Sequence, residues 1–252
     1  MASVTVDDVG LTIRDPQFQA NEFRVDARTL KISVIVPTLD EEASIGQVLT
    51  DMPMDVVDEL IVVDGSTDAT AKIAQGLGAK IVLESRMGYG RALQSGIEKS
   101  VGDVLVYIDG DGSYDSRDIA KVTEAIMKGE CDVVLGNRFN KGMQIGAMPL
   151  LNRIGNHALS IFFSLFFAKR VHDSQCGLRA VRKQILERTH YNDYGMPYVT
   201  EQLIKLVKRH ARVRSVPITY RPRTGRTKLS LWTDGFKILK VILRERLRRS
   251  AA

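Results

Sequence analysis

Apolar and polar residues alternate in blocks along the first half of the chain, and these blocks predict a repeating order of strands and helices. Short apolar, β-branched runs occupy Ile32 to Pro37, Leu60 to Asp64, Val104 to Asp109 and Asp132 to Gly136. Continuous apolar runs of this length are typical of strands covered on both faces, as in a parallel sheet. Helical spacing lies between them, at residues 43–51, 69–77, 90–100 and 117–128. The order predicts a doubly wound α/β layer whose ligands bind at the carboxyl ends of the strands.

Unusual polar residues follow the predicted strands, at the edge where such a sheet binds ligands. They are Pro37, Asp40 and Glu41 after the first run, Asp64 at the end of the second, Asp109 and Asp111 at the third of these runs, and Asn137 and Arg138 after the last. The glycine-rich segment SRMGYGRAL, residues 85–93, opens a predicted helix. Such a helix start is expected to bring backbone amides and Arg91 near a phosphate.

The run VLVYIDGDGSYD, residues 104–115, is the strongest local signal because two carboxylates lie one residue apart after a buried strand. Crowded carboxylates repel one another unless a cation neutralises them, and Mg²⁺ or Mn²⁺ prefers such oxygen ligands together with substrate phosphates. The run therefore predicts a divalent-metal site, with a solvated acidic turn as the alternative. An EF-hand loop is excluded because Tyr114 and Ala120 stand where its glycine and glutamate belong. A haloacid-dehalogenase-type phosphatase stays open, weakened by the lack of a later acidic pair.

The second half of the chain changes character after about Phe139. Its apolar segment His157 to Ala168 fits either a buried helix or one that lies in a membrane interface. The segment Leu231 to Arg249 predicts a basic amphipathic helix that contacts a membrane, a partner or its own domain. Its predicted apolar face holds Leu231, Phe236, Leu239, Leu243 and Leu247, and Trp232 would suit an interfacial anchor.

Composition narrows the class of protein without deciding it. The chain has 252 residues and a net charge of +6, which suits one large α/β domain that contacts anions. Cys131 and Cys176 match no zinc spacing and form no disulfide framework. The N-terminal 31 residues mix acids and bases, which argues against a signal peptide, and the longest apolar stretch is far below the ~20 residues of a membrane span. We therefore expect a cytoplasmic protein that lies on a bilayer without crossing it.

Taken in order, the motifs PTLDEEASI, VVDGSTD, GYGRAL, DGDGSYD and GNRF resemble the nucleotide-binding half of inverting family 2 glycosyltransferases with the GT-A fold. The segments NRIGN, HDSQCGLRAV and RPRTGRTKL are similar to those of dolichyl or polyprenyl phosphate sugar transferases. The likeness covers about residues 32–230. It implies a doubly wound, mostly parallel sheet with helices on both faces, divided into a nucleotide-sugar half (32–138) and an acceptor half (139–230). An N-terminal extension (1–31) and the basic C-terminal helix (231–252) flank this domain.

The resemblance also implies roles for individual residues. Pro37, Asp40, Glu41 and Asp64 would line the base and ribose pocket, with Gly88, Arg91 and Gly110 also binding the nucleotide sugar. Asp109 and Asp111 would hold Mg²⁺ or Mn²⁺ against the donor diphosphate, while Ser113 replaces a glutamine that is often a further ligand in relatives. The catalytic set is Asp111 with four cations that would handle phosphates: Arg138, Arg179, Arg223 and Lys228.

The implied reaction transfers a hexose, with mannose from GDP-mannose favoured over glucose from UDP-glucose, to a polyprenyl or dolichyl phosphate. An ionised phosphate attacks the anomeric carbon without a general base, so the configuration inverts and no catalytic histidine is needed. The enzyme would lie on the cytoplasmic face of a membrane, in contact with lipid or a small membrane subunit. One alternative is a glycosyltransferase with a soluble acceptor. A nucleic-acid-binding protein is disfavoured because aromatic residues make up 6% and no docking motif is visible.

Overall fold

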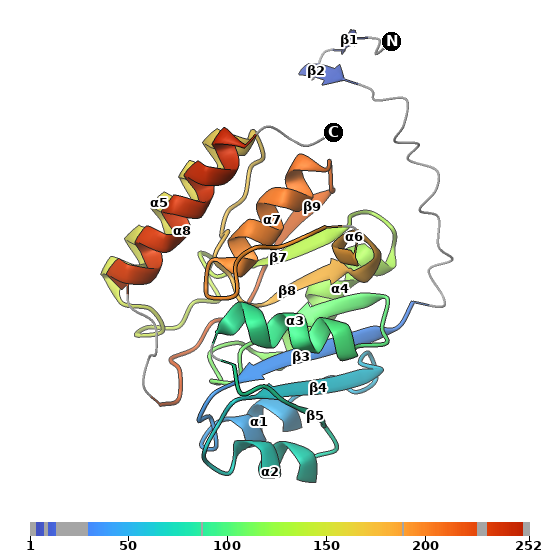
Figure 1. The fold of residues 1–252 in the computed structure, drawn as a ribbon, viewed down its shortest axis with the longest axis vertical. Helices are drawn as coiled ribbons and strands as arrows, with labels where there is room; N and C mark the ends of the chain where they lie inside the picture. The colour runs from blue at the N-terminus through green and yellow to red at the C-terminus, as the bar shows by residue number, and fades with distance from the viewer. Residues whose placement is uncertain are drawn as a thin grey trace.

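A mostly parallel sheet of seven strands forms the centre of the computed structural model (Figure 1). The structure describes residues 4–7, 10–13, 30–86, 88–187, 189–225 and 231–248, with backbone alone for 4–13, 231 and 232. Across the sheet the strands run in the order β5-β4-β3-β6-β8-β7-β9. Their bounds are β3 (Ile32–Thr38), β4 (Glu59–Asp64), β5 (Lys80–Leu83), β6 (Val104–Tyr107), β7 (Val133–Asn137), β8 (Arg179–Arg182) and β9 (Val213–Pro217).

Strand direction brings several strand ends to one edge of this sheet. β3 pairs in parallel with β4 and β6, β4 with β5, and β7 with β9. Only β8 is reversed in this sheet, because it runs antiparallel to both β6 and β7. The register places Thr38 opposite Asp64, and Tyr107 opposite Arg179. The carboxyl ends of β3, β4 and β6 therefore meet the start of β8, and we call this side the carboxyl edge.

Helices cover both faces of the sheet, which explains the continuous apolar runs of its strands. Alternate residues of β3 enter different cores: Val34 and Val36 pack with Ile45 of α1, while Ile35 packs with Leu93 of α3. The helices are α1 (Ile45–Thr50), α2 (Thr70–Gly76), α3 (Tyr89–Lys99), α4 (Ile119–Met127) after a short 3-10 turn, α5 (Leu150–Phe167), α6 (Lys183–Glu187), α7 (Tyr198–Lys208) and α8 (Leu231–Leu247). The predicted two-sided α/β layer is confirmed.

Helix α8 packs on its own domain beside α5 and α7 (Figure 1). Its buried apolar residues are Ile238, Val241 and Ile242, which join the same core as α3 and α7. The predicted apolar face points elsewhere, because Phe236 is 67% exposed and Leu247 is 84% exposed. The helix therefore has an inner apolar face that docks it and outer apolar residues that remain at the surface. The predicted contributions of the Leu231 and Trp232 side chains lie outside the described residues.

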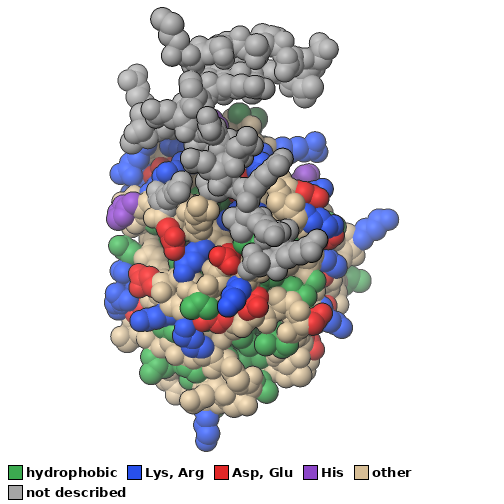
Figure 2. All heavy atoms as spheres, turned by 90° about the vertical axis from the view of Figure 1, so that its right-hand side faces the viewer, with side chains coloured by type: hydrophobic (Ala, Val, Ile, Leu, Met, Phe, Trp, Pro, Cys, Tyr) green, Lys and Arg blue, Asp and Glu red, His purple; other side chains and the backbone are tan. Residues whose placement is uncertain are grey.

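The opposite side of the sheet, where the chain enters β3, is the amino edge. Figure 2 shows this side of the molecule, with acidic and basic side chains interspersed. Glu59 at the start of β4 is ion-paired with Lys80 at the start of β5, at 3.0 Å. Asp132 before β7 is paired with Arg212 before β9, at 2.9 Å. Charges at the amino edge therefore neutralise one another.

Within the N-terminal extension, residues 4–7 and 10–13 form a small antiparallel sheet. β1 (Val4–Asp7) pairs with β2 (Gly10–Ile13), with Val4 opposite Ile13 and Asp7 opposite Gly10. The resemblance that covers residues 32–230 did not predict this hairpin.

Candidate functional site

A cavity of about 380 Å³ lies at the carboxyl edge of the sheet. Of the residues predicted from the sequence, those that line it are Pro37, Glu41, Gly88, Asp109, Gly110, Asp111 and Arg223. They come from the ends of β3 and β6, the start of α3 and the loop after β9. The parallel order of β3 and β6 thus brings together residues that are far apart in the sequence.

Asp109 is held in a closely packed corner of this cavity. The Tyr89 hydroxyl donates a hydrogen bond of 2.8 Å to Asp109 Oδ1. The backbone of Gly177 lies against the other oxygen, because a Cβ at Gly177 would come within 2.7 Å of Asp109 Oδ2. Burial and the nearby charge of Asp111 raise the pKa of Asp109 to about 6. A carboxylate in this position is stabilised by any cation that approaches it.

Asp111 is fixed from two sides. The backbone N–H of Ser113 donates 2.9 Å to Asp111 Oδ1, and the Arg223 guanidinium forms an ion pair with Asp111 Oδ2. The loop that carries Arg223 docks on the same segment, since Thr224 N–H donates to the carbonyl of Asp111 at 2.9 Å. Within the described part of the chain, Arg223 Nε is a buried donor that lacks an acceptor. Arg223 also lines the cavity, which places its guanidinium beside any phosphate that binds there.

The carboxylates of Asp109 and Asp111 are suitable ligands for a hard divalent cation. Among the residues that the structure describes, no group of three or more His, Cys, Asp or Glu side chains is placed to hold a metal. Mg²⁺ and Mn²⁺ are commonly bound by one or two carboxylates, with phosphate and water oxygens completing the shell. The residues present therefore fit a cation that binds together with a phosphorylated ligand.

Asp40 and Asp64 brace the strand ends and do not line the cavity. Asp64 is 3% exposed and accepts hydrogen bonds from Thr38 Oγ1 at 2.6 Å and Ser66 Oγ at 2.5 Å. Asp40, in the left-handed region at φ 48°, accepts from Thr67 N–H at 3.0 Å. Both carboxylates hold the loops after β3 and β4 together, so the predicted base and ribose contacts are not visible in this arrangement.

The start of α3 differs from the prediction. The backbone N–H groups of Gly90 and Arg91 donate to the carbonyls of Gly195 and Tyr194, at 3.2 and 2.9 Å. The Arg91 guanidinium stacks over the Tyr194 ring at 3.6 Å. These donors bind the loop before α7. In this structure Arg91 and its amide therefore connect α3 to that loop, where the sequence predicted phosphate contacts. Gly88 lines the cavity, at a φ of 135° that favours glycine.

Two of the predicted phosphate-binding arginines are buried away from the cavity. Arg138 forms a bidentate pair with Asp173, at 2.7 and 2.8 Å, and both side chains are buried. Arg179 is 1% exposed, and its guanidinium donates to the carbonyls of Cys176 and Val199, each at 3.0 Å. Neither residue lines the cavity. In this structure their donors join β7 and β8 to neighbouring segments, and their phosphate role stays a prediction. Lys228 lies outside the described residues.

Other cavity residues were not singled out from the sequence: Glu84, Arg86, Tyr89, Asp234 and Lys237. Hydrogen bonds from Arg86 and Ser95 lower the pKa of Glu84 to about 2, so this carboxylate is ionised and already paired. Asp234 and Lys237 belong to α8, far along the chain from the other lining residues. Arg86 and Tyr89 lie inside the glycine-rich segment 85–93, and Asp234 and Lys237 lie inside the predicted C-terminal helix, but their place in the cavity becomes visible only in the folded chain.

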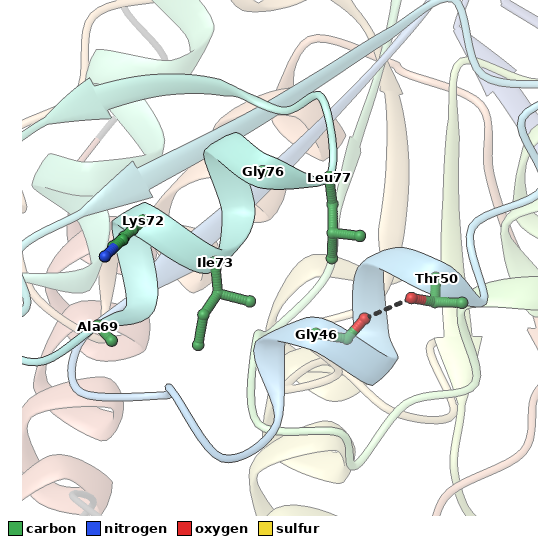
Figure 3. A pocket seen from close by; sticks show the side chains of 7 residues that line it. All are labelled: Gly46, Thr50, Ala69, Lys72, Ile73, Gly76 and Leu77. Carbon is green, nitrogen blue, oxygen red and sulfur yellow. Dashed lines mark hydrogen bonds between the residues drawn. The ribbon is translucent and has the colours of Figure 1, made fainter.

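A second hollow, of about 630 Å³, lies between α1 and α2 (Figure 3). Ile73 and Leu77 line it together with Gly46 and Thr50, whose hydroxyl donates to the Gly46 carbonyl at 2.8 Å. Its only charged lining residue is Lys72, which leaves it without a carboxylate to bind a cation. Although larger, it lacks the chemistry gathered at the carboxyl edge.

Comparisons with known proteins agree on the family. The model of glycosyl transferase family 2 matches residues 33–189. The chain is 36% identical over 223 residues to the dolichyl-phosphate hexose transferase of Haloferax volcanii, covering 86% of this chain and 96% of that protein. It is 30% identical over 218 residues to the low-salt glycan biosynthesis hexosyltransferase Agl6 of the same organism, covering 84% of this chain and 53% of that protein.

Among solved structures, glucosyl-3-phosphoglycerate synthase from Mycobacterium tuberculosis has the same fold. In its complex with Mn²⁺, uridine diphosphate and phosphoglyceric acid the TM-score is 0.72 at 23% identity, over 89% of this chain and 81% of that one. The predicted GT-A fold is thereby confirmed. The family match also decides against the phosphatase and nucleic-acid-binding hypotheses. The chain belongs to glycosyl transferase family 2 and is a glycosyltransferase.

Proposed function

We propose that this glycosyltransferase moves a hexose from a nucleotide-sugar donor to a polyprenyl or dolichyl phosphate at a membrane surface. The donor phosphates bind in the carboxyl-edge cavity, with Mg²⁺ or Mn²⁺ held by Asp109 and Asp111. The observation that carries this proposal is the pair of crowded carboxylates beside Arg223 in a cavity built from β3, β6 and α3. The name of the Haloferax volcanii relative supports the class of acceptor.

The proposed chemistry follows from charge. An acceptor phosphate is already ionised near neutral pH, so its oxygen attacks the anomeric carbon without giving up a proton. The bond from that carbon to the donor diphosphate breaks as the new bond forms, and in-line attack inverts the configuration. When bound, the divalent ion neutralises charge that develops on the leaving diphosphate. Arg223, which lines the cavity, supports the same charge through its guanidinium.

The proposal also specifies which nucleotide sugar is the donor. We favour GDP-mannose over UDP-glucose because the motif pattern along the chain leans toward mannosyl enzymes. Pro37 and Glu41 line the cavity and are the candidates for contacts with the base and ribose. A base preference can be measured without the acceptor, by comparing the affinities of GDP and UDP in the presence of Mn²⁺.

The proposed membrane surface is the outer side of α5 and α8. On α5, Ile154 is 56% exposed, Ile161 58% and Leu165 73%. On α8, Phe236 and Leu247 are exposed among the basic residues Lys240, Arg246 and Arg248. Apolar side chains ringed by cations suit the interface of a bilayer that contains anionic lipid. No helix in the described ranges combines the length and apolarity of a membrane span.

The activity test offers labelled GDP-mannose, UDP-glucose and other nucleotide sugars together with polyprenyl phosphate and Mn²⁺ or Mg²⁺. Label that moves into the organic phase, and stops moving after chelator is added, is the expected result. Asp111→Ala should abolish transfer with an unchanged circular dichroism spectrum. Absence of nucleoside diphosphate binding in the presence of excess divalent ion overturns the proposal.

The surface test uses vesicles with and without anionic lipid. Leu165→Ser together with Leu247→Ser changes only exposed side chains, so the fold should persist while vesicle binding falls. Exchanging two exposed residues outside α5 and α8, Met54 and Val101, for serine is the control. If both double variants keep full vesicle binding, the outer side of α5 and α8 is not the membrane surface. If the wild-type protein binds no vesicles and transfers no sugar to polyprenyl phosphate, a glycosyltransferase with a soluble acceptor becomes the better description. Truncation before α8 is unsuitable, because Ile238, Val241 and Ile242 belong to the core.

A further inference from the structure

We propose that α8 forms part of the donor-binding site. Lys237 of this helix contacts the donor diphosphate, and the ion pair between Arg244 and Glu201 holds the helix in position. The inference rests on the proposed nucleotide-sugar function and deepens it. Helix α8 lies beyond residues 33–189, the part matched by the family model.

The first observation is which residues share the cavity. Lys237 and Asp234 of α8 line it together with Asp109 and Asp111 of the sheet edge. Lys237 is ion-paired with Asp234 at 3.5 Å, and its side chain is 65% exposed. An exposed pair of this length is weak, so the ammonium is free to exchange a carboxylate for a phosphate. A diphosphate drawn to the metal-binding carboxylates would lie in the same cavity as this cation.

The second observation is the anchor at Glu201 of α7, whose side chain is fully buried. Its oxygens accept the backbone N–H groups of Asn192 and Asp193, at 3.0 and 2.8 Å. They also meet the ammonium of Lys205 at 2.7 Å and the guanidinium of Arg244 at 3.3 Å. A buried carboxylate with this many donors is held firmly, because losing one leaves charge that water cannot reach.

The loop bound by Glu201 is itself part of the cavity. Gly195 and Met196 line the cavity and follow the two residues whose amides Glu201 accepts, Asn192 and Asp193, after one intervening residue. The carbonyls of Tyr194 and Gly195 bind the first turn of α3, where Tyr89 meets Asp109. Glu201 therefore binds both Arg244 of α8 and the loop that lines the cavity. The same loop is bonded to α3, whose Tyr89 orients the metal-binding carboxylate of Asp109.

Apolar packing alone does not fix α8 in this way. Ile238, Val241 and Ile242 supply a non-directional contact that permits small rotations and shifts of the helix. Arg244 adds directed bonds to Glu201 and Asp193, both at 3.3 Å. We therefore assign Arg244 as a positioning residue, which acts on the donor through the place of Lys237 and of the loop.

The test compares Arg244 of α8 with Arg248, the residue after the end of this helix, in the full chain. Arg244 and Arg248 both contact Glu245, at 3.3 and 3.4 Å, but in the described residues only Arg244 reaches Glu201 and Asp193. Arg244→Ala and Arg248→Ala each remove one positive charge that contacts the same glutamate. With Mn²⁺ present, calorimetry should give a Kd for GDP or UDP raised about tenfold in Arg244→Ala and unchanged in Arg248→Ala. Arg244→Lys should restore part of the affinity.

The contact between Lys237 and the diphosphate is tested with a second matched pair of variants. Lys237→Gln should weaken the binding of nucleoside diphosphate about tenfold and that of the monophosphate less, whereas exposed Lys240→Gln should change neither. This pair decides the proposal even if Arg244→Ala lowers the melting temperature. Wild-type protein that binds neither GDP nor UDP overturns the proposed function and this inference with it. Wild-type protein that binds one of them, with equal affinities within both pairs of variants, overturns this inference alone.

Discussion

The two edges of the same sheet treat charge in opposite ways. At the amino edge, Glu59 and Asp132 each face a cation within 3.0 Å. At the carboxyl edge, Asp109 and Asp111 crowd one another in a cavity, and burial with this repulsion raises the pKa of Asp109 to about 6. The carboxylates named at the amino edge are neutralised by cations of the chain itself. At the carboxyl edge Arg223 pairs with Asp111, yet the pKa of Asp109 stays raised, so a cation from outside the chain would stabilise this edge further. Such a perturbed carboxylate is typical of a binding site.

The largest effect expected from this contrast is on catalysis. Asp111→Asn removes one charge from the carboxyl edge while keeping the size of the side chain, and should lower kcat about 10³-fold because the metal site loses a ligand. Asp58→Asn is the matched change at the amino edge, where Asp58 accepts the N–H of Ile32 at 2.8 Å. Its steady-state rate should stay within about twofold of wild type. An equal loss of kcat in the two variants would contradict the proposed difference between the carboxyl edge and the amino edge.

The next effect is on stability in the presence of chelator. The folded pKa of Asp109 is about 6, above its ordinary value of 3.8, so the folded protein binds a proton that the unfolded chain has lost between these pH values. Stability from this group is present at low pH and is lost as the pH rises through 6. Asp109→Asn should therefore raise the free energy of unfolding at pH 7.5 by on the order of 2 kcal/mol, and by much less at pH 4.5. Urea titrations at both pH values test this, and a loss of stability at pH 7.5 would contradict it.

A smaller effect with the opposite sign is expected at the amino edge. Asp132 receives the Arg212 guanidinium at 2.9 and 3.1 Å and its backbone N–H at 2.8 Å. Asp132→Asn should lower the free energy of unfolding by about 1–2 kcal/mol, because it weakens charge-assisted bonds that tie β7 to β9. Donor affinity should not change. Urea unfolding and calorimetry with GDP and Mn²⁺ separate these results, and a change in affinity would show that the amino edge also serves the site.

The smallest effect is expected at the exposed pair of Lys80 and Glu59. The Lys80 side chain is 45% exposed, and water screens its interaction with Glu59. Lys80→Met should cost about 0.5 kcal/mol or less, and this difference should disappear in high salt. Thermal melts at low and high ionic strength measure it. A loss as large as that of Asp132→Asn would mean that exposed pairs matter more at this edge than their screening allows.

Hydrophobic patterning predicted the strands whose residues enter two apolar cores. The runs at Ile32, Leu60, Val104 and Asp132 correspond to β3, β4, β6 and β7 within one residue, except that β6 ends at Tyr107, two residues before the end of its run. The pattern did not predict the edge strands β5 and β9 or the central strand β8. The sequence of β8, RAVR, lacks the expected pattern because Arg179 and Arg182 are buried. Their guanidinium groups donate to backbone carbonyls, which makes burial of the charge tolerable. Such bonds depend on distant carbonyls that no local pattern reveals.

The site was predictable to the extent that it lies at strand ends. Asp109, Asp111 and Pro37 follow buried strands, and the parallel order of those strands brings them to one cavity. Tyr89 and Lys237 were missed because their importance comes from contacts across the fold. The burial of Arg138 and Arg179 was missed for the complementary reason, since arginines that occur in phosphate-binding motifs were expected to face solvent and ligand. In the structure their partners are Asp173 and backbone carbonyls.

The reversed strand β8 also limits how the polypeptide can be divided or assembled. A cut after residue 138 would leave β6 and β7 on one fragment, although both are hydrogen-bonded to β8 on the other. Such a fragment would expose one edge of β6 and both edges of β7, because β9 is also lost, and unpaired edges favour aggregation. During synthesis, too, the sheet is completed only after residue 217 has left the ribosome, and the corner around Asp109 is complete only after Gly177 has been made.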